Sequence, residues 1–170
     1  MRTRNHYTMA DWMPENDWLL EDVTKKVGGA MTKQVTRTIS HDQFFKNKGI
    51  DDMRYVKPDR KITIDYIPKK NLAKIKYNLK EGDIGVLIFK KLENIFAAHM
   101  WMVYIKDGRI IIRESSTRGM TTFDTDYDQW AEGIGKSNRY SGISLMRVKD
   151  DLNKPGKIIL PWDISKIKKS

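Results

Sequence analysis

The sequence predicts an α+β fold in which N-terminal helices pack on an antiparallel β-sheet or a small β-barrel. Helical patterns occur mainly in the first half of the chain, whereas short apolar segments follow one another in the second half. Asp107-Gly108 separates two of these segments, and Asp-Gly favours a tight hairpin turn. The 170 residues fit the usual domain size of about 100–200. We therefore expect a single domain over 1–170, with two parts, 1–80 and 81–165.

The first part, residues 1–80, opens with a helical pattern. Asp11 or Asn16 can cap a helix that continues to Gly28-Gly29, because both side chains accept hydrogen bonds from the first free amides of a helix. The elements expected after it are two half-buried strands, 35–40 and 61–67, and two short segments, a helix or loop over 41–49 and an amphipathic helix over 71–79.

The second part, residues 81–165, is expected to hold the antiparallel β core. Its predicted strands are short segments bounded by turn residues: 84–89, 97–105, 109–113, 142–148 and 158–160. Pro161 should end the last strand because proline has no N–H to donate. The alternating aspartates of Asp124–Asp128 lack the glycine and the glutamate of a calcium loop, so we expect them to cap a helix that begins near Tyr127 or Trp130.

Composition excludes several classes of protein. An apolar content of 39% with five Trp, seven Tyr and five Phe is enough to form a core. The absence of cysteine excludes disulfides, cysteine-ligated zinc and thiol catalysis by this chain. No apolar run reaches the roughly 18 residues of a transmembrane helix, and the N-terminus leads into no apolar signal-peptide region. As written, the chain is expected to stay in the cytoplasm.

The charge of the chain is strongly positive. A formal net charge of +10 attracts polyanions such as nucleic acid, anionic lipid or acidic envelope polymers. A solvated, lysine-rich surface accounts for the same composition. Nucleic acid is the less favoured partner, because the lysines form no stripe with interleaved aromatics.

Three motifs follow one another in the second part of the chain. Gly82-Asp83-Ile84 precedes an apolar strand, His99 lies within the next strand, and Glu114-Ser115-Ser116 closes a third. This order resembles the NlpC-type papain-like cysteine amidohydrolases. More closely, it is similar to the N-acetylmuramoyl-L-alanine amidase-like family of unknown function. An Arg-x-His-Tyr segment followed by Asp-Trp, also found in that family, is matched by residues 4–12 with one additional residue.

The resemblance implies a Cys-His-polar triad that cleaves amide bonds in peptidoglycan peptides. His99 matches the family histidine, and Glu114 occupies the place of a second histidine in relatives, where a carboxylate can orient the imidazole. Without the resemblance, a histidine satisfied by a backbone carbonyl is the simpler interpretation of His99. The residues expected to line the substrate groove beside the pair are Tyr7, Trp12, Trp101, Ser115 and Ser116.

The nucleophile of such a triad is missing. In the family the cysteine lies on a helix before the His-Tyr and Asp-Trp segment, so the chain resembles a family member without its N-terminal portion. A hydroxyl of Ser115 or Ser116 is a weaker replacement, because nucleophilic serines usually lie on sharp turns with oxyanion donors nearby. The chain is therefore predicted to need an N-terminal segment or a partner chain that carries the cysteine.

Two functions follow from these observations. The first is a cell-wall amidase or peptidase-like domain, inactive alone, which acts on peptidoglycan fragments or cell-wall peptides in the bacterial envelope, periplasm or extracellular space. The alternative is a noncatalytic basic module that binds cell-wall glycan, peptide or another polyanion. We expect no cofactor and no metal, because His6, His41 and His99 are too scattered for a local zinc motif.

Overall fold

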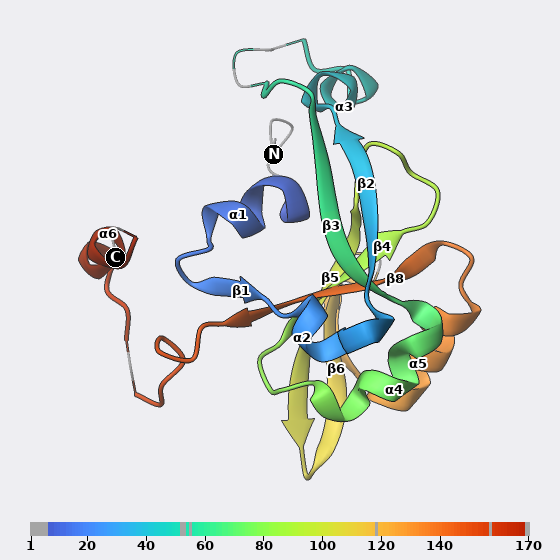
Figure 1. Ribbon diagram of the computed structural model, residues 1–170, viewed down its shortest axis with the longest axis vertical. Coiled ribbons are helices and arrows are strands. Elements are labelled where there is room, and N and C mark those ends of the chain that lie inside the picture. The colour runs from blue at the N-terminus through green and yellow to red at the C-terminus, as the bar shows by residue number, and fades with distance from the viewer. Residues whose placement is uncertain (1–6, 52–53, 55, 118, 157, 169–170) are drawn as a thin grey trace.

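The computed structural model describes residues 7–51, 54, 56–117, 119–156 and 158–168. Within these residues the chain forms one mixed α+β arrangement around an antiparallel sheet (Figure 1). Its eight strands are β1 (Leu20–Asp22), β2 (Lys33–Ile39), β3 (Arg60–Pro68), β4 (Ile84–Phe89), β5 (Ala97–Lys106), β6 (Arg109–Ser116), β7 (Thr121–Asp126) and β8 (Tyr140–Val148). Its α-helices are α1 (Met13–Glu15), α2 (Thr24–Gly28), α3 (His41–Asn47), α4 (Leu72–Ile75), α5 (Tyr127–Lys136) and α6 (Pro161–Ile167).

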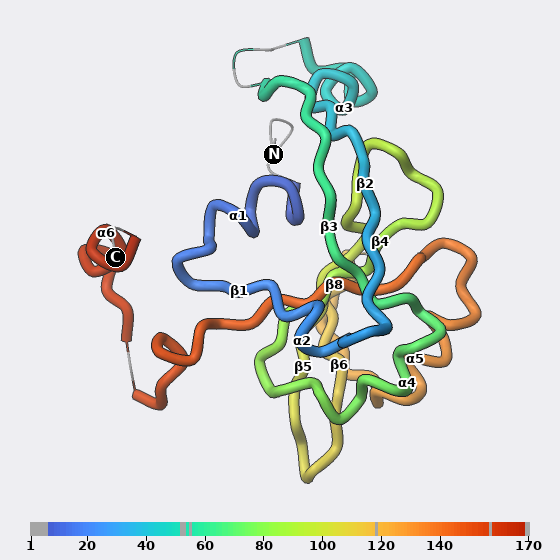
Figure 2. The backbone as a smooth tube through the Cα atoms, in the orientation of Figure 1, coloured from blue at the N-terminus to red at the C-terminus, as the bar shows by residue number. Residues whose placement is uncertain are grey.

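The strands follow the spatial order β2-β3-β8-β4-β5-β6-β7, and β1 pairs with the end of β8. β2 and β7 are the ends of this path, so the sheet is open and the barrel alternative is not the one adopted. The β2–β3 hairpin reaches beyond the body of the sheet to α3 (Figure 2). The C-terminal segment runs away from the sheet and ends in α6, which lies on the α1 side of the molecule (Figure 2). No helix within the described ranges is long and apolar enough to cross a membrane.

Two buried clusters lie on the two faces of the sheet. The helix-side core combines residues of α2, α4 and α5 with inward side chains of the strands, among them Leu87, Trp101 and Ile112. The N-terminal core lies beneath residues 7–20 and includes Met9 and Val86. Because successive side chains of a strand point to opposite faces, each central strand contributes to both cores. Burial on both faces explains why 84–89 is an uninterrupted apolar run.

Most strand predictions are confirmed. β4 has the predicted bounds, and β5 and β6 form the predicted hairpin. Asp107 and Gly108 have φ angles of +50° and +72°, which is the left-handed conformation that a two-residue hairpin turn requires. The predicted amphipathic helix is also present, although 3-10 turns flank α4, and Leu72, Ile75 and Leu79 are buried as expected.

The aspartates of β7 cap α5 and form an ion pair. Asp126 is the N-cap of α5, and its side chain accepts a hydrogen bond from the amide of Asp128 at 2.9 Å. Asp124 forms a bidentate ion pair with Arg113, with both N–O distances 2.8 Å. Tyr127, the first residue of α5, donates its hydroxyl to the carbonyl of Leu72 at 2.7 Å, which ties α5 to α4.

Two local predictions were wrong. The helix expected through residues 18–23 is interrupted, because Leu20 and its neighbours form β1 and pair with β8 near Val148. A tertiary partner thus overrides the helical pattern. Residues 158–160 form no strand, and Pro161 begins α6 instead of ending regular structure. Proline is well tolerated there, since the first helical residue has no intrahelical acceptor for its N–H.

Candidate functional site

His99 and Glu114 meet on adjacent strands of the sheet. In β5, Trp101 is paired directly with Glu114 of β6, and His99 lies two residues before Trp101 on the same face. The imidazole Nε2 of His99 lies 3.2 Å from Oε1 of Glu114. The His99 side chain is 33% exposed and that of Glu114 is 11% exposed. Solvent therefore reaches the imidazole, whereas the carboxylate behind it is largely covered.

The carboxyl group of Glu114 lies in a desolvating environment. Burial raises the pKa of Glu114 above its ordinary value, while the His99 imidazole and the indole of Trp130 oppose the rise. The indole of Trp130 lowers the pKa of Glu114 through a short-range contact, although its Nε1 forms no hydrogen bond of normal geometry. The contact is an ion-pair distance rather than a hydrogen bond, and when ionised the carboxylate favours a proton on the facing Nε2 of His99. Nδ1 is then the ring nitrogen left for proton exchange.

Trp101 belongs to the helix-side core behind the pair, and it also lines a shallow hollow that Glu114 and Ser115 share. Its side chain is 2% exposed and packs edge-to-face on Trp130, with ring centroids 4.7 Å apart. Gly85 of β4 makes room for the indole, because a Cβ atom at Gly85 would lie 2.0 Å from the Trp101 ring. Trp101 therefore joins β4, β5 and α5, and it holds in place the strands that carry His99 and Glu114.

The two serines lie on opposite faces of β6. Ser115 lines a shallow hollow of about 390 Å³ together with Trp101, Glu114 and Arg113. Ser116 accepts a hydrogen bond from the amide of Gly119 at 3.3 Å, in the turn before β7. Within the described part of the chain, neither hydroxyl forms a hydrogen bond with His99.

Tyr7 and Trp12 pack against the N-terminal core. His99 is paired with Leu87, whose side chain belongs to the helix-side core, so the sheet separates His99 from both aromatics. The ring of Tyr7 instead contacts those of His41, at 5.0 Å, and Phe44, at 5.6 Å. The structure thus brings together His99 and Glu114 but not Tyr7 and Trp12. Residues 4–6 of the same motif lie outside the described residues.

The aspartate of the Gly-Asp-Ile motif is structural. Asp83 is fully buried and pairs with Arg147 of β8, with N–O distances of 2.6 and 2.8 Å. It also accepts a hydrogen bond from the amide of Lys80 at 2.8 Å. A buried, bidentate ion pair satisfies both charges, and here it fixes the start of β4 against β8.

A second histidine and carboxylate pair, His41 and Asp11, was missed by the sequence analysis. His41 Nε2 lies 3.3 Å from Oδ2 of Asp11, outside hydrogen-bond geometry, and both side chains are at most 2% exposed. The His41 Nδ1 accepts a hydrogen bond from the amide of Lys57 at 3.4 Å. Because Nδ1 is an acceptor, Nε2 carries the proton of the neutral ring.

Asp11 is the centre of a charge cluster. Its carboxylate accepts hydrogen bonds from Lys57 Nζ at 2.7 Å, from Arg60 and from the amide of Tyr7 at 2.9 Å. Burial opposes ionisation, but these partners together lower the pKa of Asp11 below its ordinary value. Burial, assisted by Arg60 and Lys57, also lowers the pKa of His41. The cluster therefore fastens residues 7–15 to the chain around Lys57 and β3.

No local signal in the sequence could have found this cluster, since its members are separated by up to about fifty positions. The motif that contains Asp11 was the one clue, and it indicated a groove rather than an anchor. Within the described residues, no group of three or more His, Asp or Glu side chains is arranged to hold a metal ion.

The described residues thus form an α+β domain whose antiparallel sheet carries His99 and Glu114 on adjacent strands. The family model of AmiA-like proteins, described as N-acetylmuramoyl-L-alanine amidase-like, matches residues 1–131. The chain belongs to this family, which is bacterial and related to peptidoglycan. No curated protein matches the chain.

Solved structures share the fold. A Legionella pneumophila protein of family DUF1460 superposes with a TM-score of 0.66 at 15% identity, over 85% of this chain and 62% of that protein. An N-acetylmuramoyl-L-alanine amidase from Bacteroides uniformis superposes with a TM-score of 0.64 at 20% identity, over 87% of this chain and 65% of the amidase. The chain thus spans less than two thirds of the length of either protein.

Proposed function

We propose that the chain is the histidine-bearing part of a peptidoglycan amidase and that it cleaves no amide bond by itself. One observation carries this proposal: His99 and Glu114 are paired at 3.2 Å with the imidazole open to solvent, in a chain of 170 residues without cysteine. Family membership supplies the reaction class, and the missing thiol accounts for the expected lack of activity.

The pair is suited to general acid and base work. The carboxylate of Glu114 faces Nε2 of His99 and favours a proton there, so Nδ1 can take the proton of a thiol supplied by residues outside these 170. The resulting thiolate attacks the carbonyl carbon of the amide. The imidazolium then returns the proton to the departing nitrogen, and hydrolysis of the thioester by water, again with His99 as base, completes the cycle.

The proposed substrate is the amide bond between N-acetylmuramate and L-alanine, and the proposed partners are peptidoglycan fragments in the bacterial envelope. Support comes from the description of the family and from the Bacteroides uniformis amidase that shares the fold. A long, covalently continuous substrate is also consistent with a histidine that lies near the surface rather than in a closed cavity.

Digestion of N-acetylmuramoyl-L-alanyl-D-isoglutamine, followed by mass spectrometry, tests the proposal. The chain alone should release no N-acetylmuramate. The chain co-expressed with the cysteine-bearing N-terminal segment of a family member should release it, and His99→Ala should abolish the release. Cleavage by the chain alone that persists in His99→Ala would contradict both the site and the requirement for an added thiol.

A further inference from the structure

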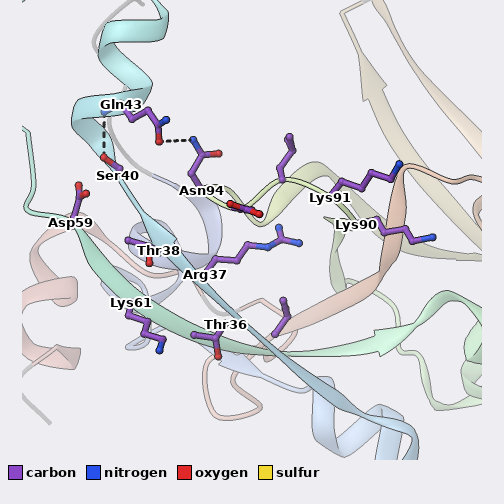
Figure 3. A pocket seen from close by; sticks show the side chains of 13 residues that line it. Thr36, Arg37, Thr38, Ser40, Gln43, Asp59, Lys61, Lys90, Lys91 and Asn94 are labelled. Atoms are coloured by element: carbon purple, nitrogen blue, oxygen red, sulfur yellow. Dashed lines mark hydrogen bonds between the residues drawn. The ribbon is translucent and has the colours of Figure 1, made fainter.

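A polar groove lies between β2 and the segment that joins β4 to β5 (Figure 3). Its volume is about 760 Å³, within the range of about 300–1,000 Å³ that is usual for ligand sites. Side chains of β2 form one wall and residues 90–94 form the other. None of the residues that line it belongs to the His99–Glu114 pair, so the groove is independent of the proposed amidase chemistry.

A buried arginine lies at the base of this groove. Arg37 is 7% exposed, and its guanidinium donates to the carbonyls of Phe89 and Ile95. The guanidinium also lies over the ring of Phe96, 5.2 Å from the ring centroid. Among the described residues no carboxylate forms an ion pair with Arg37. The two carbonyls satisfy two of its five N–H donors, but they do not neutralise the charge.

An uncompensated buried charge is costly. Burial lowers the pKa of Arg37, yet a guanidinium stays protonated in proteins. An anion held near Arg37 would offset this cost, and a planar carboxylate matches the planar fork of arginine. Arg37 therefore gives the groove a preference for negative charge that does not depend on flexible surface lysines alone.

The rim of the groove adds positive charge and neutral hydrogen-bonding groups. Three exposed lysines, Lys61, Lys90 and Lys91, line it together with Arg37, against two carboxylates, Asp59 and Glu93. The neutral polar side chains of the lining are Thr36, Thr38, Ser40, Gln43 and Asn94. The amide of Asn94 donates to Gln43 at 3.3 Å (Figure 3), which joins α3 to the loop and steadies this wall.

We propose that this groove binds a segment of an anionic glycan, a polysaccharide strand that carries carboxylate groups. Arg37 and the lysines contact the carboxylates, and the threonine hydroxyls and side-chain amides contact sugar hydroxyls. No described residue of the lining is aromatic, whereas single-stranded nucleic acid is usually bound by stacking its bases on aromatic rings. The mixture of cations and hydroxyl-binding groups thus favours a glycan over a nucleic acid.

Isothermal titration calorimetry with three hexamers tests the proposal. Hexagalacturonate should bind, maltohexaose should not, and hexathymidylate should bind at least about tenfold more weakly than hexagalacturonate because the groove offers no stacking platform. Binding of hexagalacturonate should weaken with salt, since its main contacts are between exposed charges. Equal affinity for hexathymidylate, or no binding of hexagalacturonate, would overturn the assignment.

Two double variants with the same change of charge distinguish binding in the groove from diffuse binding to the basic surface of the protein. Lys90→Ala with Lys91→Ala should weaken hexagalacturonate binding about tenfold, the loss expected for two exposed charge contacts. Lys70→Ala with Lys74→Ala removes two exposed lysines that do not line the groove and should change affinity less than about twofold. Equal losses in both variants would show a diffuse polyanion surface and refute the site.

Arg37→Lys tests the role of the buried, planar guanidinium of Arg37. This variant keeps the charge but loses the planar donors, so hexagalacturonate should bind at least about tenfold more weakly even in protein that circular dichroism shows to be folded. Unchanged binding in folded Arg37→Lys would refute the role of Arg37. If the variant does not fold, the comparison of the two lysine variants still decides the proposal.

Discussion

The two histidine and carboxylate pairs of this protein have nearly the same atomic separation and very different surroundings. Nε2 lies 3.2 Å from the carboxylate in His99–Glu114 and 3.3 Å in His41–Asp11. His99 is 33% exposed, while His41 is 1% exposed. Asp11 is contacted by two further cations, whereas no lysine or arginine of the described residues pairs with Glu114. Separation alone therefore does not identify a reactive pair.

The pKa values of the two carboxylates are shifted in opposite directions. Lys57, the Tyr7 amide and Arg60 lower the pKa of Asp11 in spite of its burial, whereas burial raises the pKa of Glu114 in spite of His99. A buried carboxylate that two cations contact is suited to hold segments of the chain together. An imidazole that is a third exposed, with one orienting carboxylate, is suited to exchange protons with a substrate or a thiol. The predictions below separate these two roles, beginning with the largest expected effect.

Asp11→Asn should destabilise the protein by about 3 kcal/mol, because it removes the buried carboxylate that Lys57 and Arg60 contact. Urea denaturation, monitored by tryptophan fluorescence, measures the free energy of unfolding. Asp42→Asn provides a matched control, since Asp42 forms an exposed i,i+4 pair with Lys46 and should cost less than about 0.5 kcal/mol. Equal costs for the two variants would show that Asp11 is no anchor.

Substitution of the two histidines should give contrasting results. His41→Ala should cost about 2 kcal/mol, because it removes buried ring contacts and leaves the Lys57 amide without its acceptor. His99→Ala should cost less than about 1 kcal/mol, since its side chain is a third exposed. Thermal and urea unfolding of both variants provide the comparison. A larger loss for His99→Ala would reverse the assignment of roles.

The two carboxylates should also respond oppositely to pH. The folded-state pKa of Asp11 is lowered, so its stabilisation is present above its unfolded pKa of about 3.9 and is lost as pH falls through the lower folded value. The folded-state pKa of Glu114 is raised, so ionising Glu114 costs stability as pH rises from its unfolded pKa of about 4.3.

The cost of Asp11→Asn should therefore shrink on acidification below about pH 4. Glu114→Gln should instead be neutral or stabilising by up to about 1 kcal/mol at pH 7 and should approach the wild type near pH 3. Unfolding free energies measured between pH 3 and pH 7 distinguish the trends. A loss of stability in Glu114→Gln that grows toward neutral pH would mean that its carboxylate is held by partners as Asp11 is.

The sequence predicted the parts of the fold that depend on local chemistry. Asp107-Gly108 determined the β5–β6 hairpin, and the apolar run 84–89 gave β4 with its observed bounds. Residues 18–23 could not be predicted in the same way, because their strand exists only through pairing with β8. The predicted strand over 158–160 was wrong for the same reason, because these residues pair with no strand among the described residues.

The candidate site was predicted in part for a similar reason. His99 and Glu114 belong to strands whose hairpin register follows from a two-residue turn, so their proximity was implied by the sequence. Tyr7 and Trp12 were expected at the same groove because their motif accompanies the family. The two faces of the sheet separate them, and the sequence pattern did not specify which face residues 7–12 would cover.

The most direct test of the central claim is the rate of amide cleavage by the chain joined to a cysteine-bearing N-terminal segment of a family member. The substrate is N-acetylmuramoyl-L-alanyl-D-isoglutamine, and the rates of His99→Gln and His41→Gln are corrected for the fraction of folded protein. Loss of the general base should lower the rate at least about a hundredfold in His99→Gln, whereas His41→Gln should keep the wild-type rate. An undiminished rate in His99→Gln, or an equal loss in folded His41→Gln, would contradict the account.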